Sequence, residues 1–137
     1  MRNFDEYKTE STIDDTKDHC MISISVYSGD TDVAKILCFY MKGDRTLIIG
    51  DIDTVPEYKR KGLGLLRIQE VLKILGERNL QVDRYLAADV EGYPPTDEAR
   101  QIAESFFESL GFERLKKYHW HTDEETLQKK LNEKMQK

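Results

Sequence analysis

The residues of this chain that are best suited to chemistry lie between positions 55 and 64, where the sequence reads Val-Pro-Glu-Tyr-Lys-Arg-Lys-Gly-Leu-Gly. Three cations precede a Gly-x-Gly pair, and a long amphipathic segment follows. The first turn of a helix has unpaired N–H groups and a partial positive charge, so a pyrophosphate can bind there. Glycine lets the backbone approach such a ligand closely. The stretch predicts a phosphate-binding loop; the alternative is a plain strand-to-helix turn with solvated lysines.

Two well-known phosphate loops do not fit this stretch. The dinucleotide fingerprint needs a third glycine, and this chain has Arg67 at that position. The P-loop needs Gly-Lys-Ser/Thr, whereas Gly64 is followed by two leucines. The loop is therefore compatible with a nucleotide-type ligand, but it is not one of the usual dinucleotide or triphosphate loops.

The elements that position this loop follow from the hydrophobic periodicity. Short turns separate the first three apolar runs, which predicts an antiparallel meander. Two helices with apolar stripes and two further strands follow, so the simplest fold is α/β (α+β), with one mixed sheet covered by helices in a single domain over residues 1–137. The expected strands are Cys20–Tyr27, Ala34–Met41, Thr46–Val55, Leu80–Ala88 and Phe112–Trp120, and the expected helices are Gly62–Arg78 and Asp97–Leu110.

The two ends of the chain differ in character. Residues 1–19 are polar and acidic, which predicts either a flexible segment or one short edge strand. At the other end, a capping box over 122–125 opens a terminal helix over 122–137. Leu127, Leu131 and Met135 lie on one line of that helix. We expect this seam to pack on the body of the protein; packing on a partner chain, as in a homodimer, is the alternative.

The composition excludes several classes of protein. The formal net charge of −5 argues against a nucleic-acid-binding module. No apolar run approaches the roughly 20 residues of a membrane span, and no secretory signal is visible, so neither a membrane partner nor secretion is expected. Cys20 and Cys38 lie in apolar runs, which predicts buried free thiols and a cytoplasmic location. His119 and His121 lack further ligands nearby, so no metal is expected.

Two motifs resemble those of the GNAT superfamily of N-acetyltransferases, over roughly residues 20–121. Residues 56–64 are similar to the acetyl-CoA loop of that family, Arg/Gln-x-x-Gly-x-Gly/Ala. Residues 103–112, Ala-Glu-Ser-Phe-Phe-Glu-Ser-Leu-Gly-Phe, are similar to its Ala-x-x-x-Tyr-x-x-x-Gly-Phe motif. The order of the motifs and the strand between them make the combination specific. The resemblance implies a mostly antiparallel mixed sheet, here with a shortened N-terminal helical region and an added C-terminal helix.

The resemblance also implies a cofactor site. The strand that ends near Thr54 and Val55 would hold the pantetheine arm of acetyl-CoA through its backbone, and the loop N–H groups would bind the pyrophosphate. The residues expected to contact the cofactor are Thr54, Val55, Lys59, Arg60, Lys61, Gly62, Leu63, Gly64, Arg100 and Phe107.

Several positions depart from the family pattern. Lys59 replaces the usual Arg or Gln and keeps the charge without the planar fork. Phe107 replaces the usual Tyr, whose hydroxyl protonates the departing CoA thiolate, and Arg100 replaces an Asn that faces the cofactor. The chain before Cys20 is too short for the strand and two helices that usually wall the acceptor site. An open acceptor site is therefore expected, or one completed by a partner subunit, the 90–97 loop or the terminal helix.

The reaction implied by the resemblance is direct attack of a primary amine on the thioester of acetyl-CoA. The acceptor would be a small amine, a protein lysine or a protein N-terminus. Asp51 and Asp53 are candidates for the base that takes the proton of the amine. Tyr93 or Tyr118 could replace the missing proton donor. The alternative function is a weak or inactive GNAT-like module that binds CoA or only a partner protein.

Overall fold

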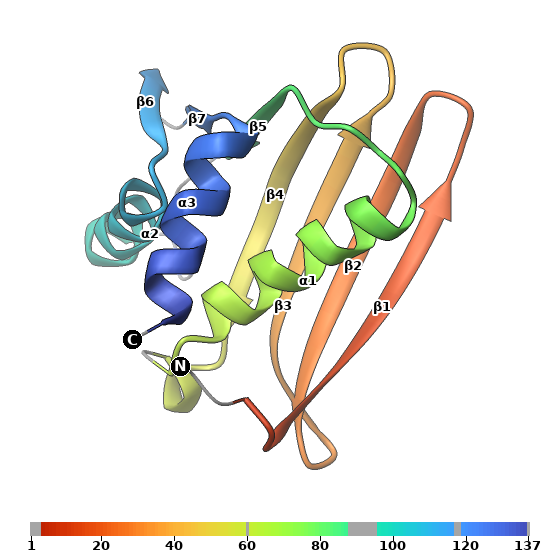
Figure 1. The fold of residues 1–137 in the computed structure, drawn as a ribbon. Helices are drawn as coiled ribbons and strands as arrows, with labels where there is room; N and C mark the ends of the chain where they lie inside the picture. The colour runs from red at the N-terminus through yellow and green to blue at the C-terminus, as the bar shows by residue number, and fades with distance from the viewer. Residues whose placement is uncertain (1–3, 60, 88–95, 117–118, 137) are drawn as a thin grey trace.

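The computed structural model describes residues 4–59, 61–87, 96–116 and 119–136. This part of the chain forms a seven-stranded sheet in the order β1-β2-β3-β4-β5-β7-β6 (Figure 1). β4 and β5 are parallel, and all other neighbours are antiparallel. The elements are β1 Tyr7–Asp15, β2 His19–Ser28, β3 Thr31–Met41, β4 Thr46–Thr54, η1 Pro56–Tyr58, α1 Leu63–Glu77, β5 Arg84–Ala87, α2 Asp97–Ser109, β6 Glu113–Lys116, β7 His119–Thr122 and α3 Glu124–Met135. A mixed, mostly antiparallel α/β fold was predicted from the sequence and is confirmed.

Of the two alternatives predicted for residues 1–19, a flexible segment or an edge strand, the structure shows the edge strand, β1. β1 pairs with β2 along its whole length, from Tyr7 opposite Ser28 to Asp15 opposite Cys20. A short turn joins the two strands directly, so no helix lies between them, and β1 is an edge strand with mostly exposed side chains. The described residues before β2 therefore form one strand and no helix, in agreement with the expected shortening of the N-terminal helical region.

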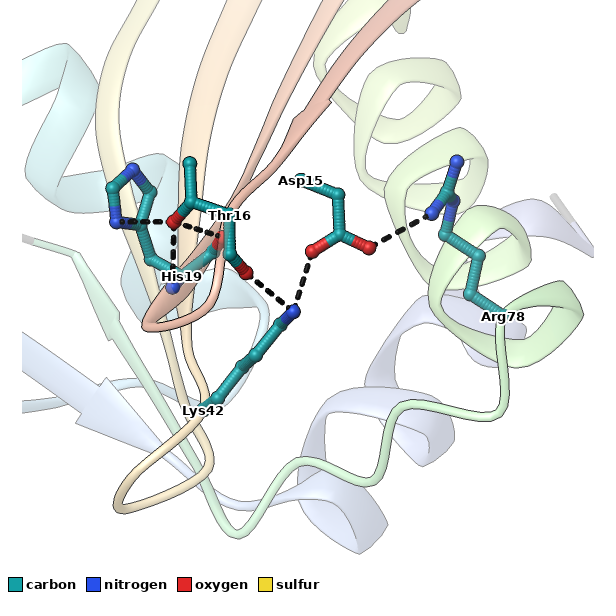
Figure 2. A network of polar contacts seen from close by, with 5 residues as sticks. All are labelled: Asp15, Thr16, His19, Lys42 and Arg78. Atoms are coloured by element: carbon teal, nitrogen blue, oxygen red, sulfur yellow. Dashed lines mark hydrogen bonds and ion pairs between the residues drawn. The ribbon is translucent and has the colours of Figure 1, made fainter.

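A polar network ties this edge strand to the rest of the protein (Figure 2). The Asp15 carboxylate accepts a hydrogen bond from Lys42 Nζ at 2.5 Å and lies 3.4 Å from Arg78 Nη1. Lys42 Nζ also donates to the Thr16 carbonyl at 2.6 Å, and the His19 N–H donates to Thr16 Oγ1 at 3.2 Å. The network thereby joins the β1–β2 turn, the β3–β4 turn and the end of α1.

The helices cover the sheet face that carries the core. Figure 1 shows α1 running across β2 and β3 with α3 beside it, and α1 contacts all three elements. Leu127 and Leu131 of α3 are buried in the same cluster as the strands, and Met135 packs against it. Intramolecular packing of the terminal helix is therefore confirmed. Its N-cap is Asp123, which accepts from the Thr126 N–H at 2.7 Å, and not Thr122, because Thr122 still belongs to β7.

The expected strand over 112–120 is wrong in one respect. The structure has two strands there, β6 and β7, which pair antiparallel with each other. β7 alternates half-buried and buried residues, whereas all four residues of β6 are exposed at the sheet edge. The chain therefore doubles back within a segment whose sequence reads as one continuous strand.

The fifth strand is shorter than expected. It covers Arg84–Ala87, and Leu80 and Val82 instead pack against the core from the connection that precedes the strand. Asn79 ends the preceding helix in a left-handed conformation, with φ 57°, as the sequence predicted. Cys20 and Cys38 are buried free thiols, also as predicted. None of the described helices is long and apolar enough to cross a membrane.

Candidate active site

The site begins with a change in pairing along β4. Pairs between β4 and β5 run from Thr46 opposite Arg84 to Ile49 opposite Ala87. Pairs with β3 continue to Thr54. Gly50 is an extra residue that makes a bulge, because Ile49 lies opposite Cys38 while Asp51 lies opposite Leu37. Beyond the bulge, the pairing recorded for the described residues leaves the β5 side of β4 open.

The direction of the backbone groups on this open segment follows from one hydrogen bond. The Val55 N–H donates to the Val33 carbonyl at 2.8 Å. In an antiparallel ladder, alternate residues face the same neighbour, so Asp53 faces β3 as well. The N–H and C=O groups of Ile52 and Thr54 therefore point to the open side.

A pocket of about 390 Å³ lies beside this segment. Its walls are the end of β4, the loop before α1, the first turns of α1, one side of α2 and the last turn of α3. The lining residues are Ile52, Asp53, Thr54, Tyr58, Lys59, Gly62, Leu63, Gly64, Leu65, Arg67, Ala99, Ile102, Ala103, Phe106, Ser109 and Lys134.

The N-terminus of α1 at this pocket differs from those of α2 and α3. α2 and α3 are capped by Thr96 and Asp123, and both have acidic residues in their first turns. α1 has neither a side-chain cap nor an acidic residue there. Gly62 is its N-cap, with φ 80°, a conformation that favours glycine. The start of α1 is therefore suited to an anionic ligand.

Close packing explains the second glycine of the loop. A Cβ atom at Gly64 would lie 2.7 Å from Cε1 of Phe106, which also lines the pocket. Glycine therefore lets the first turn of α1 approach α2. The two walls of the pocket meet at this contact.

A buried arginine holds the open segment of β4. Arg67 is only 3% exposed, and its guanidinium contacts acceptors on α1, β3 and β4. Burial lowers the pKa of Arg67 to about 10, an effect that the nearby Asp53 carboxylate partly offsets. The side chain is therefore still a cation at neutral pH.

The structure brings together part of the predicted site. Thr54, Lys59, Gly62, Leu63 and Gly64 line the pocket, together with Asp53 of the candidate bases. Lys61 is exposed and is not among the lining residues. Arg60, Tyr93 and Tyr118 lie outside the described residues, as does the side chain of Asp51. These residues stay predictions.

Three residues predicted to contact the cofactor are not among the described residues that line the pocket, and their roles stay predictions. The Val55 N–H is used by Val33, so it is not available to a ligand. Arg100 lies 3.5 Å from Asp97 and 3.4 Å from Glu104, in ion pairs along α2. Phe107 is 2% exposed in the core, because helical spacing turns it away from the pocket and presents Phe106 there instead.

Several lining residues were not predicted. The sequence holds one signal for Arg67: it lies four residues from both Leu63 and Val71. This spacing places a charged residue on the buried apolar stripe of α1. Tyr58 and Phe106 lie within residues 56–64 and 103–112, where the two motifs are found, but neither is among the predicted site residues. Lys134 lies in α3, 70 residues after Gly64 of the loop. It lines the pocket only because α3 packs beside α1.

Comparisons with known proteins identify the fold. The PaiA N-acetyltransferase from Thermoplasma acidophilum, in complex with coenzyme A, is similar at 13% identity and TM-score 0.57 over 75% of this chain. An acetyltransferase from Thermus thermophilus matches at 17% and 0.53, and a GNAT-family acetyltransferase from Staphylococcus aureus at 12% and 0.58, each over 75% of this chain. The matches span 60%, 64% and 67% of those three chains, so this chain spans less than two thirds of the first two.

No family model matches the sequence, and no curated protein matches it. The structural similarity nevertheless defines the class of fold. The chain has the fold of the GNAT N-acetyltransferases.

Proposed function

We propose that this protein transfers an acetyl group from acetyl-CoA to a primary amine. The observation that carries the proposal is the open segment of β4 beside the uncapped start of α1. Backbone groups of Ile52 and Thr54 face a pocket that is also lined by the first turn of a helix without a side-chain cap and by Lys59. This arrangement suits an extended amide chain that ends in a pyrophosphate, as coenzyme A does.

The charges around the pocket support the same ligand. Its described lining residues include three basic ones, Lys59, Arg67 and Lys134, and one acidic one, Asp53. Coenzyme A carries several phosphate charges, and a cationic site in a protein of net charge −5 favours it locally. In the similar PaiA protein, coenzyme A is bound.

In this proposal the thioester of acetyl-CoA and the acceptor amine would approach each other from opposite faces of the sheet. Asp53 lies opposite Lys35 in the ladder, whereas Thr54 lies opposite the buried Ala34, so the Asp53 side chain is directed to the face away from the core. In this proposal the amine comes from that face and Asp53 takes its proton. The direct turn between β1 and β2 leaves out the helices expected to wall the acceptor site, which favours a large or protein-borne amine.

Chemistry without a tyrosine at position 107 is feasible but slow. A thiol has a pKa of about 8.5, so a thiolate can leave near neutral pH without a positioned acid. Loss of general acid catalysis costs on the order of 10² to 10⁴ in rate. We therefore expect low turnover. We also propose a cytoplasmic location and a mechanism without a metal ion; the described residues contain no group of three metal-binding side chains.

Calorimetry with acetyl-CoA and CoA tests the cofactor, and release of free thiol with polyamines, amino acids and lysine peptides tests the reaction. We expect binding, and turnover above the blank with at least one amine. Asp53→Asn should lower that turnover about 100-fold or more, whereas Asp30→Asn, in the exposed β2–β3 turn, should not. Absence of binding at millimolar ligand would overturn the proposal. Binding without turnover would favour a noncatalytic CoA-binding module.

A further inference from the structure

Arg67 is a charged residue in a place where α1 otherwise presents apolar side chains to the sheet. Its neighbours on the same stripe, Leu63 and Val71, are buried in the core. A buried cation is costly unless it is paired or well hydrogen-bonded. Arg67 must therefore make interactions that offset this cost.

The guanidinium makes these interactions with three separate segments. Its Nε donates to the Leu63 carbonyl at 3.1 Å, and Nη1 donates to the Lys35 carbonyl at 2.8 Å and to the Asp53 carbonyl. Nη2 donates to Thr54 Oγ1 at 2.8 Å. One side chain thus joins α1, β3 and the last two residues of β4.

The bond to Thr54 bears on the pocket. Thr54 lies opposite Ala34, so its side chain is on the core face, where Arg67 fixes it. Its backbone N–H and C=O point sideways to the open edge of β4. A residue whose side chain is fixed in this way presents its backbone groups in one orientation.

We propose that Arg67 is a positioning residue for the cofactor: by holding Thr54 and Asp53, it presents the backbone of the β4 end to the amide chain of the pantetheine arm. The inference rests on the proposed function. It assigns the effect to the pantetheine part of the site and not to the phosphate-binding part at the start of α1. A lysine has the charge but cannot reach three segments with a planar fork.

The test compares Arg67→Lys and Thr54→Val with Lys73→Met, a control on the exposed face of α1. Affinities for 4′-phosphopantetheine and for adenosine 3′,5′-bisphosphate are measured separately by calorimetry. Arg67→Lys should weaken phosphopantetheine binding at least about tenfold, and Thr54→Val about tenfold, while both keep the affinity for the bisphosphate within about twofold. The double variant should lose less than the product of the two single losses. Lys73→Met should change neither affinity.

A merely structural Arg67 would give a different result. Partial unfolding would lower the apparent affinity for both fragments equally, and unchanged phosphopantetheine binding in Thr54→Val would also overturn the inference. Thr54→Val replaces only a hydroxyl with a methyl group and leaves Arg67 in place, so it tests the inference even where the arginine variant fails to fold. If the unmodified protein binds CoA but the fragments respond equally to the substitutions, the positioning role fails alone. If it does not bind CoA at all, the proposed function fails with it.

Discussion

The two halves of β4 are built for different purposes. Before the bulge at Gly50, the strand has a neighbour on each side, and Leu47 and Ile49 are buried in the core. After the bulge, β3 is its only pairing partner among the described residues, and its residues are polar apart from Ile52. The first half belongs to the paired core of the sheet, whereas the second half lies beside the pocket.

This comparison shows how one strand can combine both purposes. The bulge separates them, so the open edge begins only after the core register has been set. The open half is then stabilised from the core face by Arg67, whose hydrogen bonds do not use the edge facing the pocket. The two halves should therefore respond differently to substitution.

The largest effect is expected in the first half. Leu47 is 1% exposed, and Leu47→Ala should lower the free energy of unfolding by about 2–5 kcal/mol, because it removes buried methyl groups and leaves a cavity. Urea unfolding measures this loss. The affinity of the remaining folded protein for CoA should be unchanged. A large change in that affinity would show that the two halves are not separate.

The next largest effect is expected at Gly62, the N-cap of α1, which lines the pocket beside the open half of β4. Gly62→Glu should weaken CoA binding more than about 100-fold, because the side chain and its charge would oppose the pyrophosphate. Its left-handed conformation adds a strain of roughly 1–2 kcal/mol. Gly29→Glu is the matched control: Gly29 also has a positive φ, 61°, but lies in an open turn. It should lose similar stability and keep its affinity for CoA, as calorimetry would show; equal affinities in the two variants would mean that the loop is misassigned.

The sequence predicts the first half of β4 better than the second. Alternation and helical spacing are local signals, and they locate the strands from Cys20 to Val55 and all three helices with small errors at their ends. The glycines of the loop are recognisable because a tight turn and a close approach restrict the residue type. The site residues on these elements, such as Lys59, follow directly.

The features that sequence did not predict depend on contacts between distant segments. Whether the backbone groups of Thr54 or of Val55 face the open side of β4 is decided by the hydrogen bond from Val55 to Val33, which depends on the pairing of two strands. The role of Arg67 requires knowing what lies beneath α1. Lys134 reaches the pocket only because α3 packs beside α1.

A smaller effect is expected at β5, which pairs with the first half of β4 on the side away from β3. Tyr85 of β5 lies opposite Leu47 and donates to a Glu124 carboxylate oxygen. Burial, with the hydrogen bond and charge of Glu124, raises the pKa of Tyr85 well above its ordinary value of about 10. The folded state thus favours the protonated phenol, so this contribution to stability is present below about pH 10 and is lost as the pH rises further.

Tyr85→Phe should therefore lower the free energy of unfolding near neutral pH by about 1.5–3 kcal/mol and weaken its dependence on pH above 10. Urea titrations at pH 7 and above pH 10 measure both changes. Tyr27→Phe, on the half-buried end of β2, is the control and should preserve the pH dependence. An unaltered alkaline profile in Tyr85→Phe would show that another group causes it. Binding of CoA should not change in either variant.

The smallest effect is expected at the network of Asp15, Lys42 and Arg78, which lies beside the β3–β4 turn. The hydrogen bond from Lys42 lowers the pKa of Asp15, and the charges of Lys42 and Arg78 act in the same direction. Because the folded state favours the carboxylate, this stabilisation is complete above about pH 4 and is lost as the pH falls further. Asp15 is exposed and Lys42 is half-buried at the surface, so solvent screens the interaction.

Asp15→Asn should lower the melting temperature slightly at pH 7 and leave it nearly unchanged at pH 3, relative to the unmodified protein. The difference at pH 7 should decrease in high salt, because salt screens exposed ion pairs. Asp14→Asn, the adjacent exposed acid on the other face of β1, is the control and should show neither trend. A larger effect at pH 3 than at pH 7 would contradict the assignment. Since this network lies at the paired end of β4, none of these changes should alter the affinity for CoA.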